Sequence, residues 1–187
     1  EQVMALIGAD KIDVKDGSIR FNKPGMGITL DGIAKGFIVD RASVLLSKHK
    51  IENFLINAGG DIRTRGTRTD RKPWKVAIQD PALKGKNYPD VVRMTDGAIA
   101  TSGNYEIYFD REKMFHHIVN PRSGLSPTLS TSVSVLAKTA MEADALSTSV
   151  FVMEPEHGTA FINSLNNCEA LVITSDGNHL KSRGWKS

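Results

Sequence analysis

Residues 131–153 read TSVSVLAKTAMEADALSTSVFVM, and this stretch decides the predicted fold. Thr131–Ala137 alternates small polar and apolar residues, which is the pattern of a β-strand with one buried face. The spacing of Thr139 and Glu142 is that of a capping box, so a helix is predicted to begin here and to run to about Met153. A strand followed directly by a helix is typical of folds in which helices cover a sheet.

Strands outnumber helices in the rest of the chain, and short turns join most of them. Asp16-Gly17 and Thr95-Asp96-Gly97 are typical hairpin turns. A helix is predicted over about 33–48, with Asp31 as its N-cap, and another from Pro155 to about Asn166. The other expected strands are Lys11–Val14, Ser18–Phe21, Phe54–Ile56, Trp74–Gln79, Val91–Met94, Ala98–Ala100, Glu106–Asp110, Phe115–Val119, Glu169–Thr174 and His179–Lys181. This order predicts an α+β fold, with antiparallel sheets covered by helices, in a single domain of residues 1–187.

Composition limits the class of protein and its partners. Hydrophobic residues make up 40% of the chain and charged residues 24%, which is ordinary for a protein with a buried core. The net charge of +3 is modest, and the basic residues lack interleaved aromatic residues, so we expect no nucleic-acid partner. One basic cluster is interpreted as a solvated hairpin, with an anion or partner surface as the alternative: Arg63, Arg65, Arg68, Arg71, Lys72 and Lys75. Cys168 is the single cysteine, which excludes an intrachain disulfide.

Three short segments rich in glycine or hydroxyl groups are candidate phosphate sites. Asp31–Gly36 lies at a strand-to-helix junction, where free N–H groups and Lys35 suit an anion; the alternative is a tight junction with a solvent-facing lysine. In Asn57–Asp61, Gly59 and Gly60 allow close approach of a ligand, or simply form a bulge. Thr101-Ser102-Gly103 is predicted to be a polar turn whose hydroxyl and amide groups can donate to a phosphate.

A histidine, an aspartate and a threonine are the other candidates. His117 precedes the Asn120–Gly124 turn, and strand alternation predicts that it and His116 face opposite sides. Asp144 and Thr148 are four residues apart, so a helix places both oxygens on one face. The two side chains either bond to each other or hold Mg²⁺, which prefers hard oxygen ligands.

Five segments, taken in order and with their separations, resemble the ApbE family, the Mg²⁺-dependent FAD:protein FMN transferases. The resemblance spans about residues 11–175 and rests on Asp31–Asp40, Asn57–Asp61, Ala100–Tyr105, His117–Gly124 and Ala143–Thr148. It implies an ApbE-like (T-fold-like) architecture. It also implies an enzyme that cleaves FAD, transfers FMN to a Thr or Ser hydroxyl of a target flavoprotein and releases AMP. The alternatives are an FAD pyrophosphatase, which uses water as the acceptor, and a flavin-binding module without turnover.

The resemblance also implies roles for individual residues. His117 matches the catalytic histidine of the family. The metal ligands would be the side chains of Asp144 and Thr148 and the main-chain carbonyl of Ala34. The segments that resemble the flavin-nucleotide cleft contain Lys35, Gly59, Gly60 and Ser102.

Two departures from the family pattern accompany this resemblance. Asn120 stands where the family usually has Asp, which removes a negative charge near His117. The chain is also expected to be the C-terminal portion of an ApbE-like protein, because the N-terminal part that lines one wall of the flavin cleft in the family is not present before Glu1. By the same resemblance, the acceptor is expected to be a flavoprotein subunit of a redox pump or electron-transfer protein. The full protein is expected to be a membrane-associated lipoprotein on the periplasmic or cell-surface side of the inner membrane.

Overall fold

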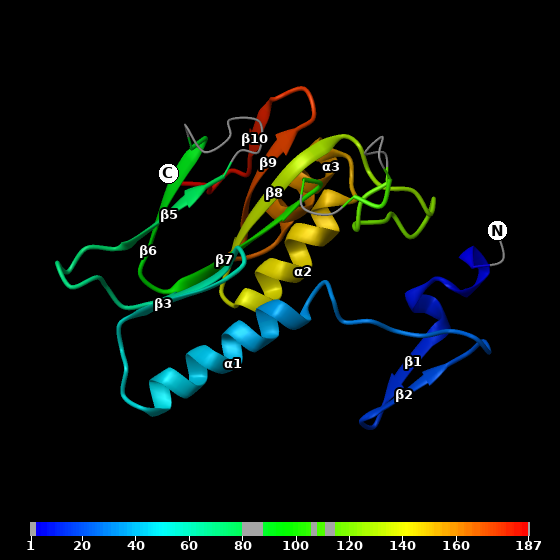
Figure 1. Ribbon diagram of the computed structural model, residues 1–187, viewed down its shortest axis with the longest axis horizontal. Helices are drawn as coiled ribbons and strands as arrows, with labels where there is room; N and C mark the ends of the chain where they lie inside the picture. Colours follow the sequence, from blue (N-terminus) through cyan, green and yellow to red (C-terminus); the bar gives the residue numbers. More distant parts are fainter. Residues whose placement is uncertain (1–2, 80–87, 106–107, 111–114, 187) are drawn as a thin grey trace.

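A six-stranded antiparallel sheet forms the centre of the protein (Figure 1). The computed structural model describes residues 3–79, 88–105, 108–110 and 115–186. The strand order in this sheet is β10-β9-β8-β7-β4-β3, and every neighbouring pair is antiparallel. The strands are β3 (Phe54–Ala58), β4 (Asp61–Arg65), β7 (Gly97–Gly103), β8 (Ser130–Ala137), β9 (Glu169–Thr174) and β10 (His179–Lys181).

Three α-helices and two small sheets complete the described structure. The helices are α1 (Ala34–Lys48), α2 (Ala140–Phe151) and α3 (Pro155–Ser164). The small antiparallel sheets pair β1 (Ile12–Lys15) with β2 (Ser18–Phe21), and β5 (Trp74–Ile78) with β6 (Asp90–Met94). Two short 3-10 helices, η1 (Met4–Leu6) and η2 (Ala9–Lys11), precede β1. The observed architecture is α+β with antiparallel sheets, as the sequence predicts.

The central sheet is covered on both faces, because alternate residues of its strands enter two different cores. On β7, Ala98 and Ala100 pack in the core that the three helices cover, while Ile99 packs against the β5–β6 sheet. On β9, Val172 belongs to the first core and Leu171 to the second. The fold therefore has three layers: the helices, the central sheet and the β5–β6 sheet.

The crossing of α1 and α2 brings the site segments together. Asp40 on α1 accepts hydrogen bonds from the backbone N–H groups of Ala140 and Met141, both at 2.9 Å. Thr139, the N-cap of α2, accepts a bond from the N–H of Glu142 at 3.2 Å, which confirms this half of the predicted capping box. Two side chains therefore satisfy the free N–H groups at the start of α2, one from its own N-cap and one from α1.

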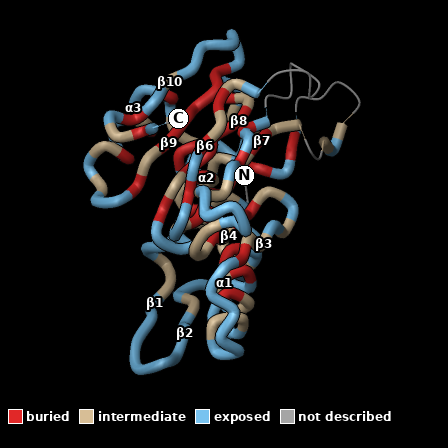
Figure 2. Tube along the Cα trace, turned by 90° about the vertical axis from the view of Figure 1, so that its left-hand side faces the viewer, coloured by how far each residue is buried: buried red, intermediate tan, exposed pale blue. Residues whose placement is uncertain are grey.

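The N-terminal hairpin stands apart from these layers. Figure 1 shows β1 and β2 joined to α1 by an extended segment, and Figure 2 shows the hairpin largely exposed. Its register pairs Lys15 with Ser18 across Asp16-Gly17, as the turn signal predicts. Within the described part of the chain, no helix has both the length and the apolar composition needed to cross a bilayer.

Several local predictions of capping, strand pairing and element type are wrong. Asp31 is not an N-cap: α1 begins at Ala34, with Ile33 before it and no side-chain cap. The predicted hairpin of 91–94 with 98–100 does not form, because β6 pairs with β5 whereas β7 pairs with β4 and β8. The predicted turn at 101–103 is the end of β7, since these residues pair with 132–134 of β8.

The region of residues 104–119 also differs from the predicted pair of strands. An isolated bridge joins Tyr108 to His116, and the residues from His117 to Asn120 form a loop. Residues 106–107 and 111–114 of the predicted strands lie outside the described residues. The basic cluster is not a hairpin either, because β4 and β5 belong to different sheets. Arg63 and Arg65 are paired there with Asp40 and Glu52 at 3.7 and 2.9 Å.

Candidate active site

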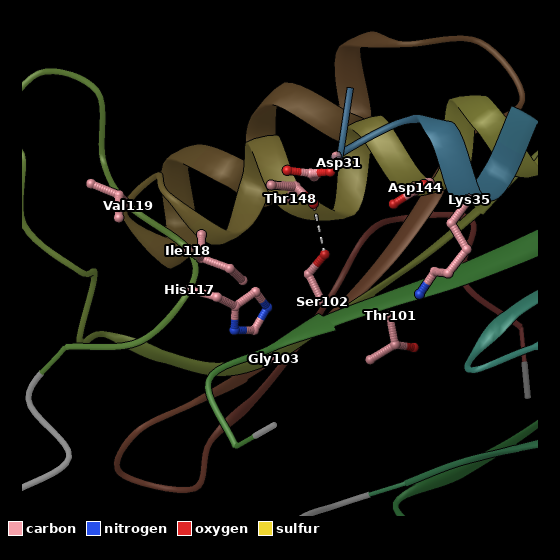
Figure 3. Close-up of a pocket in the computed structure, with 11 residues that line it drawn as sticks. Asp31, Lys35, Thr101, Ser102, Gly103, His117, Ile118, Val119, Asp144 and Thr148 are labelled. Carbon is pink, nitrogen blue, oxygen red and sulfur yellow. Dashed lines mark hydrogen bonds between the residues drawn. The ribbon is translucent and has the colours of Figure 1, made fainter. Parts of the chain in front are cut away.

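A polar cavity of about 360 Å³ lies where the N-terminus of α1, the end of β7, the middle of α2 and the loop after His116 meet (Figure 3). Its walls carry both charged groups and hydroxyl groups. The lining residues are Asp31, Gly32, Lys35, Thr101, Ser102, Gly103, His117, Ile118, Val119, Asp144 and Thr148. Segments separated by more than a hundred residues in the sequence thus contribute to one cavity.

Hydroxyl groups connect β7 to α2 at the centre of this cavity. Ser102 Oγ lies 2.8 Å from Ser147 Oγ and 3.0 Å from Thr148 Oγ1. Ser102 reaches α2 because it lies in a strand whose alternate residues face the helices, rather than in a turn. Ser147 also donates to the carbonyl of Asp144 at 3.0 Å, so this hydroxyl belongs to the same network.

Asp144 is a buried carboxylate held by the first turn of α1. Asp144 is 6% exposed, and its Oδ2 accepts a hydrogen bond from the N–H of Gly36 at 3.0 Å. Ala34 and Lys35 precede Gly36 in the same turn of α1. Thr148 lies one helical turn after Asp144 and lines the same cavity, as their spacing predicts.

A second buried carboxylate, that of Asp61, lies beside this group. Asp61 is 1% exposed, and its Oδ1 is 3.3 Å from Lys35 Nζ. Its Oδ2 has no hydrogen-bond partner among the described residues. Burial, and secondly the negative charge of Asp144, raise the pKa of Asp61 to about 7, despite the opposing effect of Lys35. Asp61 therefore interacts with both the half-exposed ammonium group of Lys35 and the buried carboxylate of Asp144.

Lys35 is held by the turn between β3 and β4 as well as by Asp61. Its Nζ donates to the carbonyl of Gly59 at 3.3 Å. The turn is closed by the N–H of Gly60, which donates to Asn57 Oδ1 at 3.0 Å. Gly59 and Gly60 have φ of 61° and 98°, a backbone conformation that favours glycine. The two glycines therefore shape the turn that positions Lys35.

His117 enters the cavity from the loop after the bridge at His116. Figure 3 shows its ring directed toward the space beside Ser102. His116 is 2% exposed whereas His117 is exposed, so the two side chains take opposite environments as predicted, although they do not lie in a regular strand. The loop places an imidazole opposite the hydroxyl groups on β7 and α2.

Asn120 closes the loop that follows His117. Its Oδ1 accepts from the N–H of Arg122 at 2.9 Å, and its backbone carbonyl accepts from Gly124 at 2.8 Å. Its Nδ2 donates to the carbonyl of Val152, the residue after α2, at 3.4 Å. An ionised Asp has no donor for this last bond. Asn120 therefore ties the histidine loop to the end of the helix that carries Asp144.

The structure collects most of the predicted site residues in one place. Lys35, Ser102, His117, Asp144 and Thr148 line the cavity. Ala34 does not line it but begins the adjacent helical turn. Gly59 and Gly60 line a neighbouring cavity of about 310 Å³, which shares Thr101 with the first.

Three polar residues of the candidate phosphate segments, which were not among the expected site residues, also lie at or beside the cavity. Asp31 and Thr101 line it, and Asp61 is buried behind Lys35. The sequence pattern predicts a capping role for Asp31 and, for Thr101, a polar turn that can donate to a phosphate. Asp61 follows the two glycines of a candidate segment, which is the signal that pointed to it. In the described ranges, no group of three or more His, Cys, Asp or Glu residues could hold a metal ion, so the Mg²⁺ ligand set stays a prediction based on one carboxylate, one hydroxyl and one carbonyl.

Comparisons with known proteins extend the resemblance over nearly the whole chain. The ApbE family model matches residues 1–172. Proteins named FAD:protein FMN transferase from Vibrio cholerae and Haemophilus influenzae are each 34% identical and match 92% of this chain. These matches cover 53% and 52% of the two relatives, so the chain spans about half the length of the curated relatives it matches.

Solved structures show the same similarity in three dimensions. The crystal structure of an ApbE protein from Thermotoga maritima matches this chain with a TM-score of 0.86 and 32% identity. The match covers 97% of this chain and 60% of the Thermotoga chain. The flavin transferase ApbE from Vibrio cholerae matches with a TM-score of 0.84 and 32% identity. This match covers 96% of this chain and 58% of the Vibrio chain.

Proposed function

Because the chain belongs to the ApbE family, we propose that this cavity binds the pyrophosphate of FAD and transfers FMN to a Thr or Ser hydroxyl of a target protein, with release of AMP. The observation that carries the proposal is the convergence of His117, Lys35 and the Asp144–Thr148 pair on one polar cavity. Phosphoryl transfer depends mainly on positioning and charge neutralisation, and this set of groups is suited to both.

Cationic and donor groups would bind the anionic substrate. Lys35 is held by Asp61 and Gly59 and lines the cavity, so its ammonium group can contact a phosphate without much loss of side-chain freedom. Ser102 is hydrogen-bonded to Thr148 and presents a hydroxyl beside it. These donors would hold the pyrophosphate between β7 and α2.

The electrostatics of the site are suited to a divalent cation. The carboxylates of Asp61 and Asp144 are both buried and lie near each other, and Lys35 pairs with Asp61. Asp61 Oδ2 lacks a hydrogen-bond partner within the described structure. Asp144, Thr148 and the carbonyl of Ala34 would hold Mg²⁺, since it prefers a few hard oxygen ligands. When bound, Mg²⁺ would supply charge neutralisation at the phosphate oxygens.

His117 would take the proton of the acceptor hydroxyl. The hydroxyl oxygen forms a bond to the phosphorus on the FMN side of FAD, the bond from that phosphorus to the bridging oxygen breaks, and AMP leaves with this oxygen. The proton passes to the His117 ring, because an imidazole can accept a proton at neutral pH. Its position at the exposed side of the cavity would let a protein acceptor reach it.

The acceptor and the location follow from the family resemblance. We propose that the acceptor is a flavoprotein subunit of a redox pump or electron-transfer protein. We also propose that the full protein works as a lipoprotein on the periplasmic or cell-surface side of the inner membrane. Similarity to proteins named FAD:protein FMN transferase supports a protein acceptor. The type of acceptor and the location rest on the family resemblance alone.

The test mixes this chain with FAD, Mg²⁺ and a peptide that carries an acceptor Thr, and follows AMP and the peptide mass. A gain of one FMN on the peptide is expected, together with loss of the reaction in His117→Ala, in Asp144→Asn and in EDTA. His157→Ala is the matched control, because His157 is exposed, pairs with Glu154 and lies outside the cavity. AMP without labelled peptide would indicate a pyrophosphatase instead, and no AMP at all would contradict the proposal for this chain.

A further inference from the structure

His116, the residue before the proposed base, is a buried imidazole with a complete set of partners. It is 2% exposed, and its ring packs edge-on against Phe151 of α2 with centroids 5.7 Å apart. The ring of Tyr108 also packs edge-on against it, with centroids 6.1 Å apart. The side chain is therefore enclosed rather than directed into the cavity that His117 lines.

One ring nitrogen of His116 lies beside a hydrogen-bond acceptor, and the other lies beside a hydrogen-bond donor. Nε2 lies 2.9 Å from the carbonyl oxygen of Pro127, which can only accept, so this nitrogen carries the hydrogen. Nδ1 lies 3.3 Å from the backbone nitrogen of Ile118, which can only donate, so this nitrogen carries the lone pair. The neutral Nε2–H tautomer of His116 satisfies both partners, and neither the other tautomer nor the charged ring does.

These bonds fix the backbone on both sides of His117. Before it, Ser126 Oγ accepts from the N–H of His116 at 3.0 Å and donates to the carbonyl of His116 at 2.9 Å. After it, the N–H of Ile118 is held by the His116 ring, and Ile118 itself is buried at 6% exposure. His117 thus projects from a short segment whose neighbours are both anchored, although it lies outside any regular strand.

We propose that His116 is a positioning residue, whose neutral ring holds the Ile118 amide and so sets the direction in which His117 enters the cavity. This inference rests on the proposed function, in which His117 accepts the proton of the acceptor hydroxyl. A proton acceptor is effective only within hydrogen-bond reach of its donor, and a displacement of about 1 Å can reduce the rate about 10²-fold. The ring of His116 thereby fixes the position of His117, although His117 lies in a loop rather than in a strand.

Two substitutions separate the hydrogen bonds of His116 from its packing. His116→Phe keeps a ring against Phe151 and removes both bonds. His116→Asn keeps a side-chain oxygen that can accept from the N–H two residues later, as in an Asx turn. We expect His116→Phe to lower kcat for AMP release about 10²-fold with little change in KM for FAD, and His116→Asn to recover most of that loss. His157→Phe is the matched control on the surface and should behave as the wild type does.

A second measurement follows the histidine rings by ¹⁵N-edited NMR and requires no turnover. In the wild-type chain at pH 7, His116 should show the pattern of the neutral Nε2–H tautomer. The ring signals of His117, assigned with His117→Ala, should shift in His116→Phe and return toward their wild-type positions in His116→Asn. This result would support the positioning role even if the chain released no AMP, which would contradict only the proposed function.

Three outcomes would overturn the inference. One is a wild-type His116 in the Nδ1–H or charged form, a result that does not depend on whether any variant folds. Another is a set of His117 ring signals in folded His116→Phe that coincides with the wild type. The third is an equal loss of kcat in His116→Asn and His116→Phe, which would show that the acceptor for Ile118 does not matter.

Discussion

At the scale of single residues, Asn120 shows how one side chain can connect two parts of the site. Its oxygen closes the loop after His117 through the N–H of Arg122, and its nitrogen reaches the carbonyl of Val152 at the end of α2. Both the histidine loop and the helix that carries Asp144 are therefore held by one amide. A carboxylate in the same place keeps the first bond and loses the second.

Asn120→Asp is expected to lower the free energy of unfolding by about 0.5–1.5 kcal/mol, because a donor is lost and a negative charge faces a carbonyl oxygen. Urea unfolding at pH 7 measures this difference. Asn163→Asp is the matched control: Asn163 uses its Oδ1 to accept from the N–H of Arg183, and Asp retains that oxygen. Equal losses in the two variants would show that the Val152 bond contributes nothing.

At the scale of elements, the crossing of α1 over α2 determines the shape of the cavity. Gly36 lies at the crossing, where its N–H donates to Asp144 and where an added Cβ would lie 2.4 Å from the carbonyl oxygen of Ala140. Asp40, one turn later, accepts from the first N–H groups of α2. Close approach and capping together fix Asp144 opposite the first turn of α1.

Gly36→Ala is expected to force these helices apart, because the new methyl group would meet backbone atoms that cannot rotate away. Overpacking of this kind costs about 1–3 kcal/mol, measured as a lower free energy of unfolding. If Asp144 holds Mg²⁺ as proposed, the variant should also weaken Mg²⁺ binding followed by calorimetry, because the Gly36–Asp144 bond lengthens. Gly27→Ala, where the added Cβ meets no atom within 4 Å, should leave both quantities unchanged; a similar loss there would refute the packing explanation.

At the scale of the whole molecule, a buried carboxylate joins the outer layer to the edge of the central sheet. Asp90, the first residue of β6, is 6% exposed and accepts from Trp185 Nε1 at 2.8 Å. Its Oδ2 also lies 2.7 Å from Lys181 Nζ on β10. Burial alone would raise the pKa of Asp90, but the bonds from Lys181, Trp185 and the Val91 N–H outweigh it and lower the pKa below its usual value of 3.8.

This lowered pKa makes the contribution of Asp90 dependent on pH. The native state binds the proton more weakly than the unfolded chain does, so the stabilisation is complete above pH 3.8 and is lost as the pH falls through the lower native pKa. Asp90→Asn is therefore expected to cost about 1–3 kcal/mol at pH 7, and less as the pH falls below about 4. Denaturant unfolding of both chains across pH 2–7 measures the difference, and a constant gap would contradict the assignment.

Local sequence pattern predicted much of the fold. The alternation in Thr131–Ala137 predicted the strand β8, and the Thr139 cap predicted the helix α2. Glu169–Thr174 was predicted with the bounds that the structure has. These features were accessible because backbone preference, capping and hydrophobic period act over a few neighbouring residues. For the same reason the Asp144–Thr148 pair could be placed on one helix face.

The sequence by itself determined most of the strands and helices, though not β4, and the residue types that are available for chemistry. Only the tertiary structure decided that β7 pairs with β4 and β8, that Ser102 lies in that strand, and that Asp61 is buried beside Lys35. Strand partners and buried charge pairs join residues that are distant in the chain, so their energies depend on packing between layers rather than on local preference. The candidate site is built from such long-range contacts.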